Sequence, residues 1–165
     1  MQVLAIDAST KSSGWAVFDD TKLVEYGCIT ASSTDLVKRI QKVISELTIV
    51  LSKHKVDKIV LEEVRPEQGL QNIKTHKALM YLQAAIVFLV HDHFPKVEID
   101  YTYPSEWRKL CGIKTGSGVR RDALKPKDIA FVQETYGITV NDDIADAIGI
   151  GHAYVNKLTN ELNWG

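Results

Sequence analysis

Short apolar runs at the start of the chain give way to longer stretches of helical periodicity. Residues 2–7 form an almost continuous apolar run that ends in Asp7, and such a run predicts a buried strand. Two more strands are expected at residues 14–18 and 23–30, with a tight turn between them near Asp19. Three short strands so closely linked predict an antiparallel meander.

Helical spacing then alternates with two further strands. Apolar residues recur every three or four positions at residues 36–51 and 73–90, which predicts two helices with one apolar face each. Runs rich in β-branched or alternating residues predict strands at 57–64 and 97–103. Three more helices are expected at residues 104–112, at 128–136, and from Asn141 to about Leu162.

The order of these elements predicts an α/β fold. Strands joined by long helical connections must pair in parallel, whereas strands joined by tight turns pair antiparallel. We therefore expect a five-stranded mixed sheet, with three antiparallel and two parallel strands, flanked by helices. A chain of 165 residues, 45% of them hydrophobic and 25% charged, suits one domain over residues 1–165.

Composition narrows the class of protein without identifying it. No uninterrupted apolar run approaches the roughly 20 residues needed to span a bilayer, and the opening MQVLAIDAST lacks the basic start of a signal peptide. Cys28 and Cys111 are too few for a disulfide framework or a zinc site. We therefore expect a cytoplasmic protein that has no membrane contact.

Charge is balanced over the whole chain but not along it. The net charge is −1, from 20 basic and 21 acidic side chains. Between Pro104 and Asp128, however, seven basic residues face three acidic ones, a local balance of +4. The segment GIKTGSGVRR within this stretch predicts an exposed basic loop. A solvated loop without a ligand is the commoner explanation of such a segment taken alone.

Acidic residues end two predicted strands and open the last predicted helix. They are Asp7, then Glu62 and Glu63, then Asp142, Asp143 and Asp146. Ligands of open α/β sheets gather at the carboxyl ends of parallel strands, and clustered carboxylates repel one another unless a cation compensates. Oxygen ligands suit Mg²⁺ or Mn²⁺ rather than zinc. Any one of these acids alone would be ordinary surface decoration, but three coincident sites favour a metal site.

Local spacing leaves two choices among these acids open. Glu62 and Glu63 point to opposite faces of their strand, so only one can be the principal ligand. Asp142 and Asp143 both share a helical face with Asp146, at roughly 40° and 60° from it. Capping by Asn141 and the helix dipole explain acids in the first turn, but they do not explain Asp146.

These motifs resemble the RuvC family of Holliday-junction resolvases, which have an RNase H-like fold. The resemblance lies in LAIDAST followed by SGWAV, in IVLEEV, and in the D-x-x-D of DIADAIGIGHA, in this order over nearly the whole chain. It implies that Asp7, Glu62, Asp143 and Asp146 are the catalytic carboxylates and bind two Mg²⁺ or Mn²⁺ ions. Asp142 is left with a capping or outer role. The product would be a nick with a 5′-phosphate.

The resemblance also implies a homodimer that binds branched DNA and nicks opposing strands of a four-way junction. The predicted helix at 73–90, with Leu79, Leu82, Ile86 and Leu89, is the expected dimer interface, unless these residues pack on their own sheet. Basic side chains are expected to contact DNA phosphates. The candidates are Arg65, Lys74, Arg108, Lys109, Lys114, Arg120 and Arg121.

The chain departs from the family at several positions. Ala8 and Ser9 stand where similar proteins often carry Pro-Gly, and Arg65-Pro66 stands where relatives often place an aromatic wedge. Trp107 could stack on a base, although a lone tryptophan on a short helix is more often part of the core. Lysines that serve the family near the site have no one-to-one match in this chain.

Three other activities compete with junction cleavage. Actin-like kinases also carry an aspartate after the first strand, but DASTKSS has no glycine before Gly14 and the chain is short for a second ATP-binding domain. An RNase H-type nuclease acting on RNA–DNA hybrids is a closer alternative. A non-catalytic protein that binds branched DNA is the third.

Overall fold

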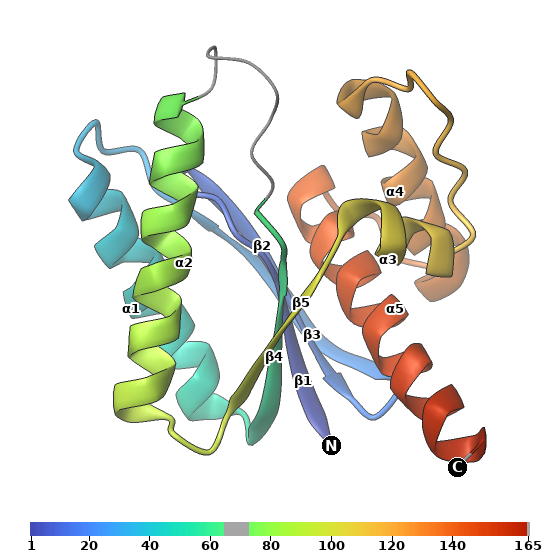
Figure 1. The fold of residues 1–165 in the computed structure, drawn as a ribbon, viewed down its shortest axis with the longest axis horizontal. Coiled ribbons are helices and arrows are strands. Elements are labelled where there is room, and N and C mark those ends of the chain that lie inside the picture. Colours follow the sequence, from blue (N-terminus) through green and yellow to red (C-terminus); the bar gives the residue numbers. More distant parts are fainter. Residues whose placement is uncertain (65–72, 165) are drawn as a thin grey trace.

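The protein folds as a five-stranded mixed sheet covered by helices on both faces (Figure 1). The computed structural model describes residues 1–64 and 73–164, apart from the side chain of Arg121. The strands are β1 (Gln2–Asp7), β2 (Ser12–Asp19), β3 (Lys22–Thr30), β4 (Val56–Glu62) and β5 (Glu98–Thr102). Their order is β3-β2-β1-β4-β5, with β1 to β3 antiparallel and β1, β4 and β5 parallel. The predicted five-stranded mixed sheet is confirmed, and within it the first and fourth strands pair in parallel.

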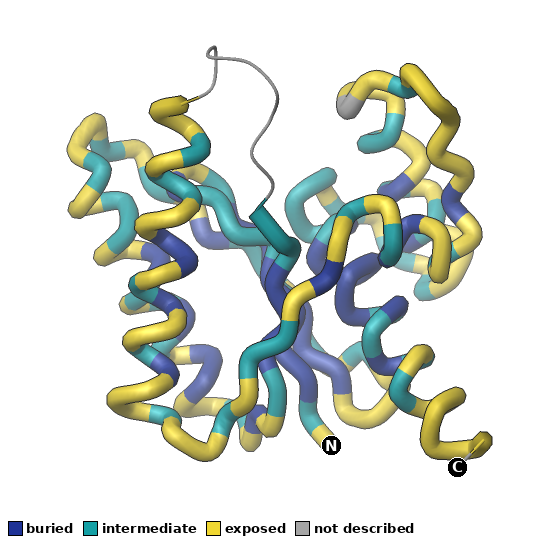
Figure 2. The backbone as a smooth tube through the Cα atoms, in the orientation of Figure 1, coloured by how far each residue is buried: buried dark blue, intermediate teal, exposed yellow. Residues whose placement is uncertain are grey.

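Helices divide unequally between the two faces of the sheet. Figure 1 shows α1 and α2 on one side and α3, α4 and α5 on the other. The buried segments lie along the sheet and on the helix sides that face it (Figure 2). The helices are α1 (Leu36–Lys53), α2 (Ile73–His93), α3 (Pro104–Leu110), α4 (Arg121–Tyr136) and α5 (Asp142–Trp164).

Alternation along β1 supplies both hydrophobic cores. Val3 and Ala5 belong to the core beneath α5, whereas Leu4 and Ile6 belong to the core beneath α1 and α2. Successive strand residues point to opposite faces, so a strand that is apolar throughout is the expected pattern for a sheet covered on both sides. This explains why residues 2–7 form an almost continuous apolar run.

Small residues let α5 lie close to the sheet and to α3. A Cβ atom at Gly151 would lie 2.3 Å from a ring carbon of Phe18, and one at Gly149 would lie 2.5 Å from a ring carbon of Trp107. Larger side chains at these two positions would therefore push α5 away from its neighbours. The glycines of DIADAIGIGHA thus set how deeply the last helix is seated.

The fourth helix begins earlier than the sequence predicted. The prediction started it at Asp128, whereas α4 starts at Arg121 and includes Pro126. Proline lacks the amide hydrogen that the helix ladder needs and is disfavoured beyond the first turn, so the pattern indicated a loop. Lys125 and Lys127 therefore belong to a helix, and the basic loop between α3 and α4 is shorter than expected.

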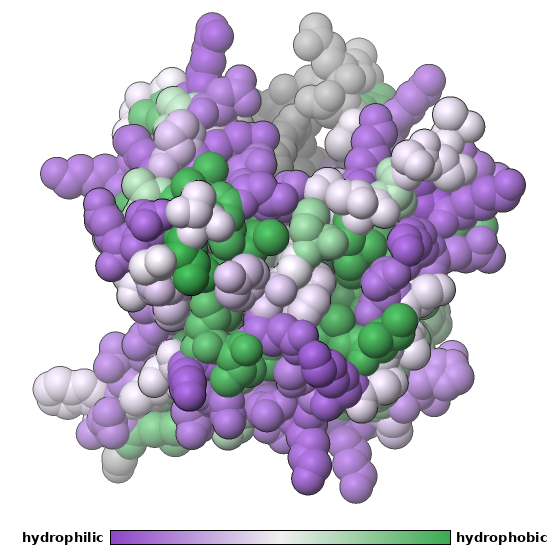
Figure 3. All heavy atoms as spheres, turned by 180° about the vertical axis from the view of Figure 1, so that it is seen from behind, coloured by the Kyte–Doolittle hydropathy of each residue, from purple (hydrophilic) through white to green (hydrophobic). Residues whose placement is uncertain are grey.

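The α2 helix is the most apolar long helix of the chain and carries apolar residues on two sides. By length and composition alone it could cross a membrane, although polar residues interrupt its apolar positions. A single such helix is weak evidence, because core helices pass the same test. Leu82 and Ile86 do pack into the core. Seen from behind, the molecule shows mainly hydrophilic side chains with smaller hydrophobic patches among them (Figure 3).

Candidate active site

Strand alternation places Asp7 and Glu62 on the same face of the sheet. Ile6 pairs with Leu61 between the parallel strands β1 and β4, so Asp7 and Glu62 each follow the last paired position. Asp7 continues the row that faces α5, and Glu62 follows Val60, which lies in the same core. Glu63 therefore points to the opposite face. The geometry favours Glu62 as the acid that shares a site with Asp7.

The start of α5 lies against β2 beside Asp7. Gly14 pairs with Asp7 across the antiparallel strands, and a Cβ atom at Gly14 would lie only 1.9 Å from the main-chain oxygen of Asp143. Glycine is required here because no side chain fits between β2 and α5. The hydroxyl of Ser12 donates a hydrogen bond to Oδ2 of Asp143. Asp143 is thus held next to the strand end that carries Asp7.

Asp142 is directed toward a different partner. Its Oδ2 lies 2.6 Å from Nζ of Lys125 on α4, and this hydrogen-bonded lysine lowers the pKa of Asp142. Asn141 caps the helix, because its Oδ1 accepts a hydrogen bond from the amide of Ile144 at 2.9 Å. These contacts favour Asp143 over Asp142 as a member of the site, the choice that spacing alone left open.

Asp146 lies one turn further along α5 and is largely buried. Burial raises the pKa of Asp146 to about 9, and repulsion from Asp7 and the neighbouring Asp128 adds to the effect. Within the described part of the chain, its Oδ1 is buried without a hydrogen-bond partner. A buried acceptor of this kind is unfavourable unless a cation or a donor reaches it. Asp7 and Asp146 are therefore close enough to repel when both are ionised.

One residue of α2 and one residue of α3 each donate a hydrogen bond to Glu62. Gln83 of α2 donates to the main-chain oxygen of Glu62 at 2.8 Å, and Nε1 of Trp107 donates to its Oε2 at 2.9 Å. Trp107 is 0% exposed, which confirms the core interpretation and leaves no face for a DNA base. Its polar atom serves the carboxylate instead.

Arg108 differs from its predicted role as a phosphate contact. The side chain is buried and makes three hydrogen bonds to the carboxylate of Asp128, at 2.8 to 3.1 Å. Its Nη2 also lies 3.8 Å from Oδ2 of Asp146. Burial works against the charge, but the bonds to Asp128 and that residue's charge raise the pKa of Arg108. The guanidinium therefore acts inside the protein rather than on DNA.

Sequence reasoning missed Asp128, Ser12 and Gln83 as neighbours of the site. Asp128 is 1% exposed, yet in the sequence it looks like an ordinary helix-opening acid. One weak signal was present in the sequence: Asp128 lies in a mainly basic segment that contains few other acids. No local pattern could show that it pairs with Arg108, because the pairing depends on how α3 and α4 pack.

The other basic residues predicted to contact DNA lie at the start of α2 and around the loop between α3 and α4, except for two whose side chains are outside the described residues. Lys74 is exposed in the first turn of α2, and Lys109, Lys114 and Arg120 are exposed along or beside the loop between α3 and α4. Figure 1 shows that α2, α4 and α5 all begin at the end of the sheet where β1 and β4 finish. Arg65 and the side chain of Arg121 lie outside the described residues.

The acids are the type of ligand that a hard divalent cation prefers, but in this structure their side chains are not close enough together to bind one. In residues 1–64 and 73–164, no three His, Cys, Asp or Glu side chains lie close enough together to hold a metal ion. The four carboxylates would have to turn toward one another to bind one, and repulsion opposes this until a cation is present. The unpartnered Oδ1 of Asp146 and the all-oxygen donor set fit Mg²⁺ or Mn²⁺.

Comparison with known families assigns the chain. Residues 3–152 match the family described as "Crossover junction endodeoxyribonuclease RuvC". The chain belongs to the RuvC family. It is accordingly an endodeoxyribonuclease, as the motifs around Asp7, Glu62 and the D-x-x-D segment predicted. The RuvC protein of Campylobacter concisus is 27% identical over 96% of this chain and 98% of its own length. That of Aliarcobacter butzleri is 29% identical over 96% and 100%.

Solved structures confirm the RNase H-like fold of this RuvC-family chain. The structure of T. thermophilus RuvC in complex with a Holliday junction substrate has a TM-score of 0.76 at 13% identity, covering 96% of each chain. Fowlpox virus resolvase, solved with a substrate Holliday junction, has a TM-score of 0.56 at 18% identity and covers 96% of this chain and 99% of its own. The fold is therefore retained where the sequence has diverged widely.

Proposed function

We propose that this RuvC-family endonuclease nicks four-way or closely related branched DNA junctions in the cytoplasm and leaves 5′-phosphate ends. The observation that carries the proposal is that Asp7, Glu62 and the acids of α5 share one face and one end of the sheet. Two relatives of the same fold were solved with Holliday junctions, which supports a branched substrate. Residues 1–165 would act as one nuclease domain.

In this proposal Asp7, Glu62, Asp143 and Asp146 hold Mg²⁺ or Mn²⁺, with two ions per site. When bound, the ions would activate a water molecule and stabilise the oxygen that leaves the cleaved phosphodiester. Asp146 would give up the proton that burial favours, because a carboxylate ligand must be ionised. Ser12 would keep Asp143 in place through its hydrogen bond.

Positively charged groups near the site would hold the DNA backbone. Lys74, Lys109, Lys114 and Arg120 are exposed, so each can reach a phosphate without leaving a buried partner. Arg65 and Arg121 remain candidates on sequence grounds. Phosphate contacts release counterions, so binding of the junction should weaken steeply as salt rises. Arg108 is not included, since its guanidinium is committed to Asp128.

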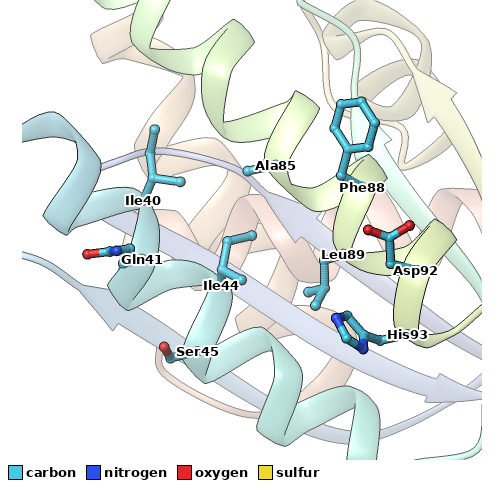
Figure 4. Close-up of a pocket in the computed structure, with 9 residues that line it drawn as sticks. All are labelled: Ile40, Gln41, Ile44, Ser45, Ala85, Phe88, Leu89, Asp92 and His93. Atoms are coloured by element: carbon cyan, nitrogen blue, oxygen red, sulfur yellow. The ribbon is translucent and has the colours of Figure 1, made fainter.

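The same protein would act as a homodimer that contacts its copy through α2. Met80, Tyr81 and Phe88 expose about half or more of their surface, with Phe88 at 66%. Phe88 also lines an open pocket of about 680 Å³ between α1 and α2, and Figure 4 shows the residues around it. The pocket is lined by Ile40, Gln41, Ile44 and Ser45 of α1 and by Ala85, Phe88, Leu89, Asp92 and His93 of α2.

A second copy is the occupant that fits this apolar surface. A junction has two opposing strands to cut, so two active sites must be joined. The predicted contact residues need correction, because Leu82 and Ile86 are buried in the chain's own core. Phe88→Asp should shift the protein toward monomer in sedimentation at micromolar concentration. Leu162→Asp removes an apolar residue on α5 that is more exposed, at 80% against 66%, and should leave the dimer intact.

One experiment tests the nuclease proposal. The protein is incubated with a synthetic four-way junction, a linear duplex and an RNA–DNA hybrid, with and without Mg²⁺, beside Asp7→Asn and Asp146→Asn. We expect Mg²⁺-dependent nicks in the junction alone and none with either variant. Cutting without metal, or active variants, would contradict the proposed site. Preferential cutting of the hybrid would favour the RNase H-type alternative, and binding without nicking would favour a non-catalytic role.

A further inference from the structure

Two consecutive residues of α3 reach two carboxylates on different elements. Trp107 donates from Nε1 to Oε2 of Glu62 on β4, at 2.9 Å, and Arg108 places Nη2 3.8 Å from Oδ2 of Asp146 on α5. We propose that α3 is a positioning helix for the metal site, in which Trp107 orients Glu62 and Arg108 orients Asp146. This inference rests on the proposed function of the four carboxylates.

The indole of Trp107 has little freedom to turn away from Glu62. Its ring lies against α5, where a Cβ atom at Gly149 would come within 2.5 Å of it. On another side, Cζ of Arg108 lies 4.4 Å from the ring centroid. A ring fixed by packing aims its N–H in one direction, and here that direction is a carboxylate oxygen. Donors that fix a metal-binding carboxylate in this way tune metal affinity.

Arg108 is itself anchored before it reaches Asp146. Its Nε and Nη2 both donate to the carboxylate of Asp128, which is 1% exposed. This two-pronged pairing fixes the plane of the guanidinium. The remaining attraction is directed to Asp146 from a distance beyond a hydrogen bond. Arg108 therefore attracts Asp146 toward α3 when that carboxylate is ionised, and it does so without occupying the carboxylate oxygens.

The arrangement is more specific than packing requires. A buried arginine is unfavourable unless its partners compensate, and Asp128 alone would suffice for that purpose. The pair instead lies beside Asp146, whose Oδ1 is buried without a hydrogen-bond partner among the described residues. A tryptophan N–H can likewise be satisfied by a main-chain oxygen, yet Trp107 uses an acid at a strand end. Both contacts therefore serve side chains that would have to be ionised and oriented to bind a cation.

Metal binding measured directly tests the inference. Mn²⁺ affinity of the intact protein is measured by titration calorimetry for wild type, Trp107→Phe and Arg108→Gln, with thermal unfolding recorded on the same samples. Trp107→Phe keeps an aromatic ring but removes the N–H, and we expect about a 10-fold weaker Mn²⁺ affinity. Arg108→Gln should weaken it to a similar degree, because Asp146 loses the guanidinium that lies 3.8 Å from its Oδ2. The Mg²⁺ concentration for half-maximal junction cutting should rise in parallel.

Trp15→Phe is the matched control for Trp107→Phe. Trp15 packs on the opposite face of the sheet, beside the core beneath α1 and α2, so the same chemical change there should leave Mn²⁺ affinity unchanged. If Trp107→Phe does not fold, benzothienylalanine at position 107 removes the N–H while keeping the shape of the indole. Arg108→Lys separates charge from geometry. It should recover only part of the affinity lost in Arg108→Gln, because lysine lacks the planar fork.

The outcomes separate this inference from the function on which it rests. Wild type that binds no Mn²⁺ and cuts no junction would overturn the proposed function and the positioning role with it. Wild type that binds and cuts, with position-107 and position-108 variants of equal affinity, would overturn the positioning role alone. A lower melting temperature with unchanged Mn²⁺ affinity would show that Trp107 and Arg108 serve only packing.

Discussion

The two faces of the sheet are built from the same strands but differ in what their outer layers carry. Beneath α1 and α2 the core is apolar, and α2 exposes further apolar residues such as Phe88 on its outer side. Beneath α3, α4 and α5 the core is equally apolar, but it ends in buried charges that include Arg108, Asp128 and Asp146. The two faces therefore differ in the side chains they carry: one exposes apolar residues, and the other holds buried ionisable groups. Strand alternation alone decides which side receives Asp7 and Glu62.

Removing one carboxylate from each face in turn should give the largest difference in nicking rate between the two faces. Asp7→Asn should reduce junction nicking on the order of 10³-fold or more, because groups that act as a unit fail together. Glu63→Gln is the control, since Glu63 follows Glu62 but points to the opposite face. It should leave the rate within about 3-fold of wild type. Both variants are compared by their nicking rates at saturating Mg²⁺. Equal losses of rate would show that the face of the sheet on which an acid lies does not determine its role.

Glycines next to the two faces should also respond differently to an added methyl group. Gly14→Ala would bring Cβ within 1.9 Å of the main-chain oxygen of Asp143, and main chain cannot rotate away. We expect a loss of roughly 1–3 kcal/mol in unfolding free energy and a large loss of nicking, because Asp143 must move.

Gly27→Ala is the matched change on β3. There the nearest atom is a side-chain ring carbon of Trp15, at 2.7 Å, and a side chain can shift. We expect a smaller loss of stability in urea unfolding and little change in activity. A loss of activity as large as that of Gly14→Ala would mean that the approach of Asp143 to β2 has no special role.

The sequence could predict the parts of this comparison that depend on local pattern. Periodicity predicted the strand containing Asp7, a strand at residues 57–64 that includes Glu62, and the helix carrying D-x-x-D. The long helical connections predicted parallel pairing but not the order of the strands in the sheet. The contacts that orient these acids were not visible. Gly14 contacts Asp143, and Arg108 pairs with Asp128, only after segments distant in sequence pack together. Pro126 also made residues 121–127 look like a loop, so the start of the helix that carries Asp128 was not predicted.

Protonation of Asp146 should make the stability of the face covered by α5 depend on pH. Its pKa is raised from 3.8 to about 9 in the folded protein, so between these values the folded state binds a proton that the unfolded state releases. Stability of the metal-free protein should therefore fall as pH rises through this window. Asp146→Asn cannot titrate, and should lose less stability than wild type between pH 5 and pH 8.

The difference should be at least about 1 kcal/mol at pH 8, or roughly 2–4 °C in Tm. Thermal unfolding in the presence of a chelator measures it. Added Mg²⁺ should narrow the gap by stabilising wild type, because only wild type retains the full set of ligands. Parallel pH profiles for wild type and Asp146→Asn would contradict the buried, protonated state of Asp146.

The smallest effect is expected at Asp142, which differs from Asp143 by one position and by its partner. Lys125 lowers the pKa of Asp142, so this ion pair adds stability at neutral pH that is lost as pH falls through the lowered pKa. The pair is partly exposed and should contribute no more than about 1 kcal/mol. Asp142→Asn should thus leave nicking within about 3-fold of wild type, whereas Asp143→Asn should nearly abolish it. Nicking rates of the two variants under identical conditions distinguish the residue that only caps the helix from the residue that binds metal. A larger loss for Asp142→Asn than for Asp143→Asn would exchange the two proposed roles.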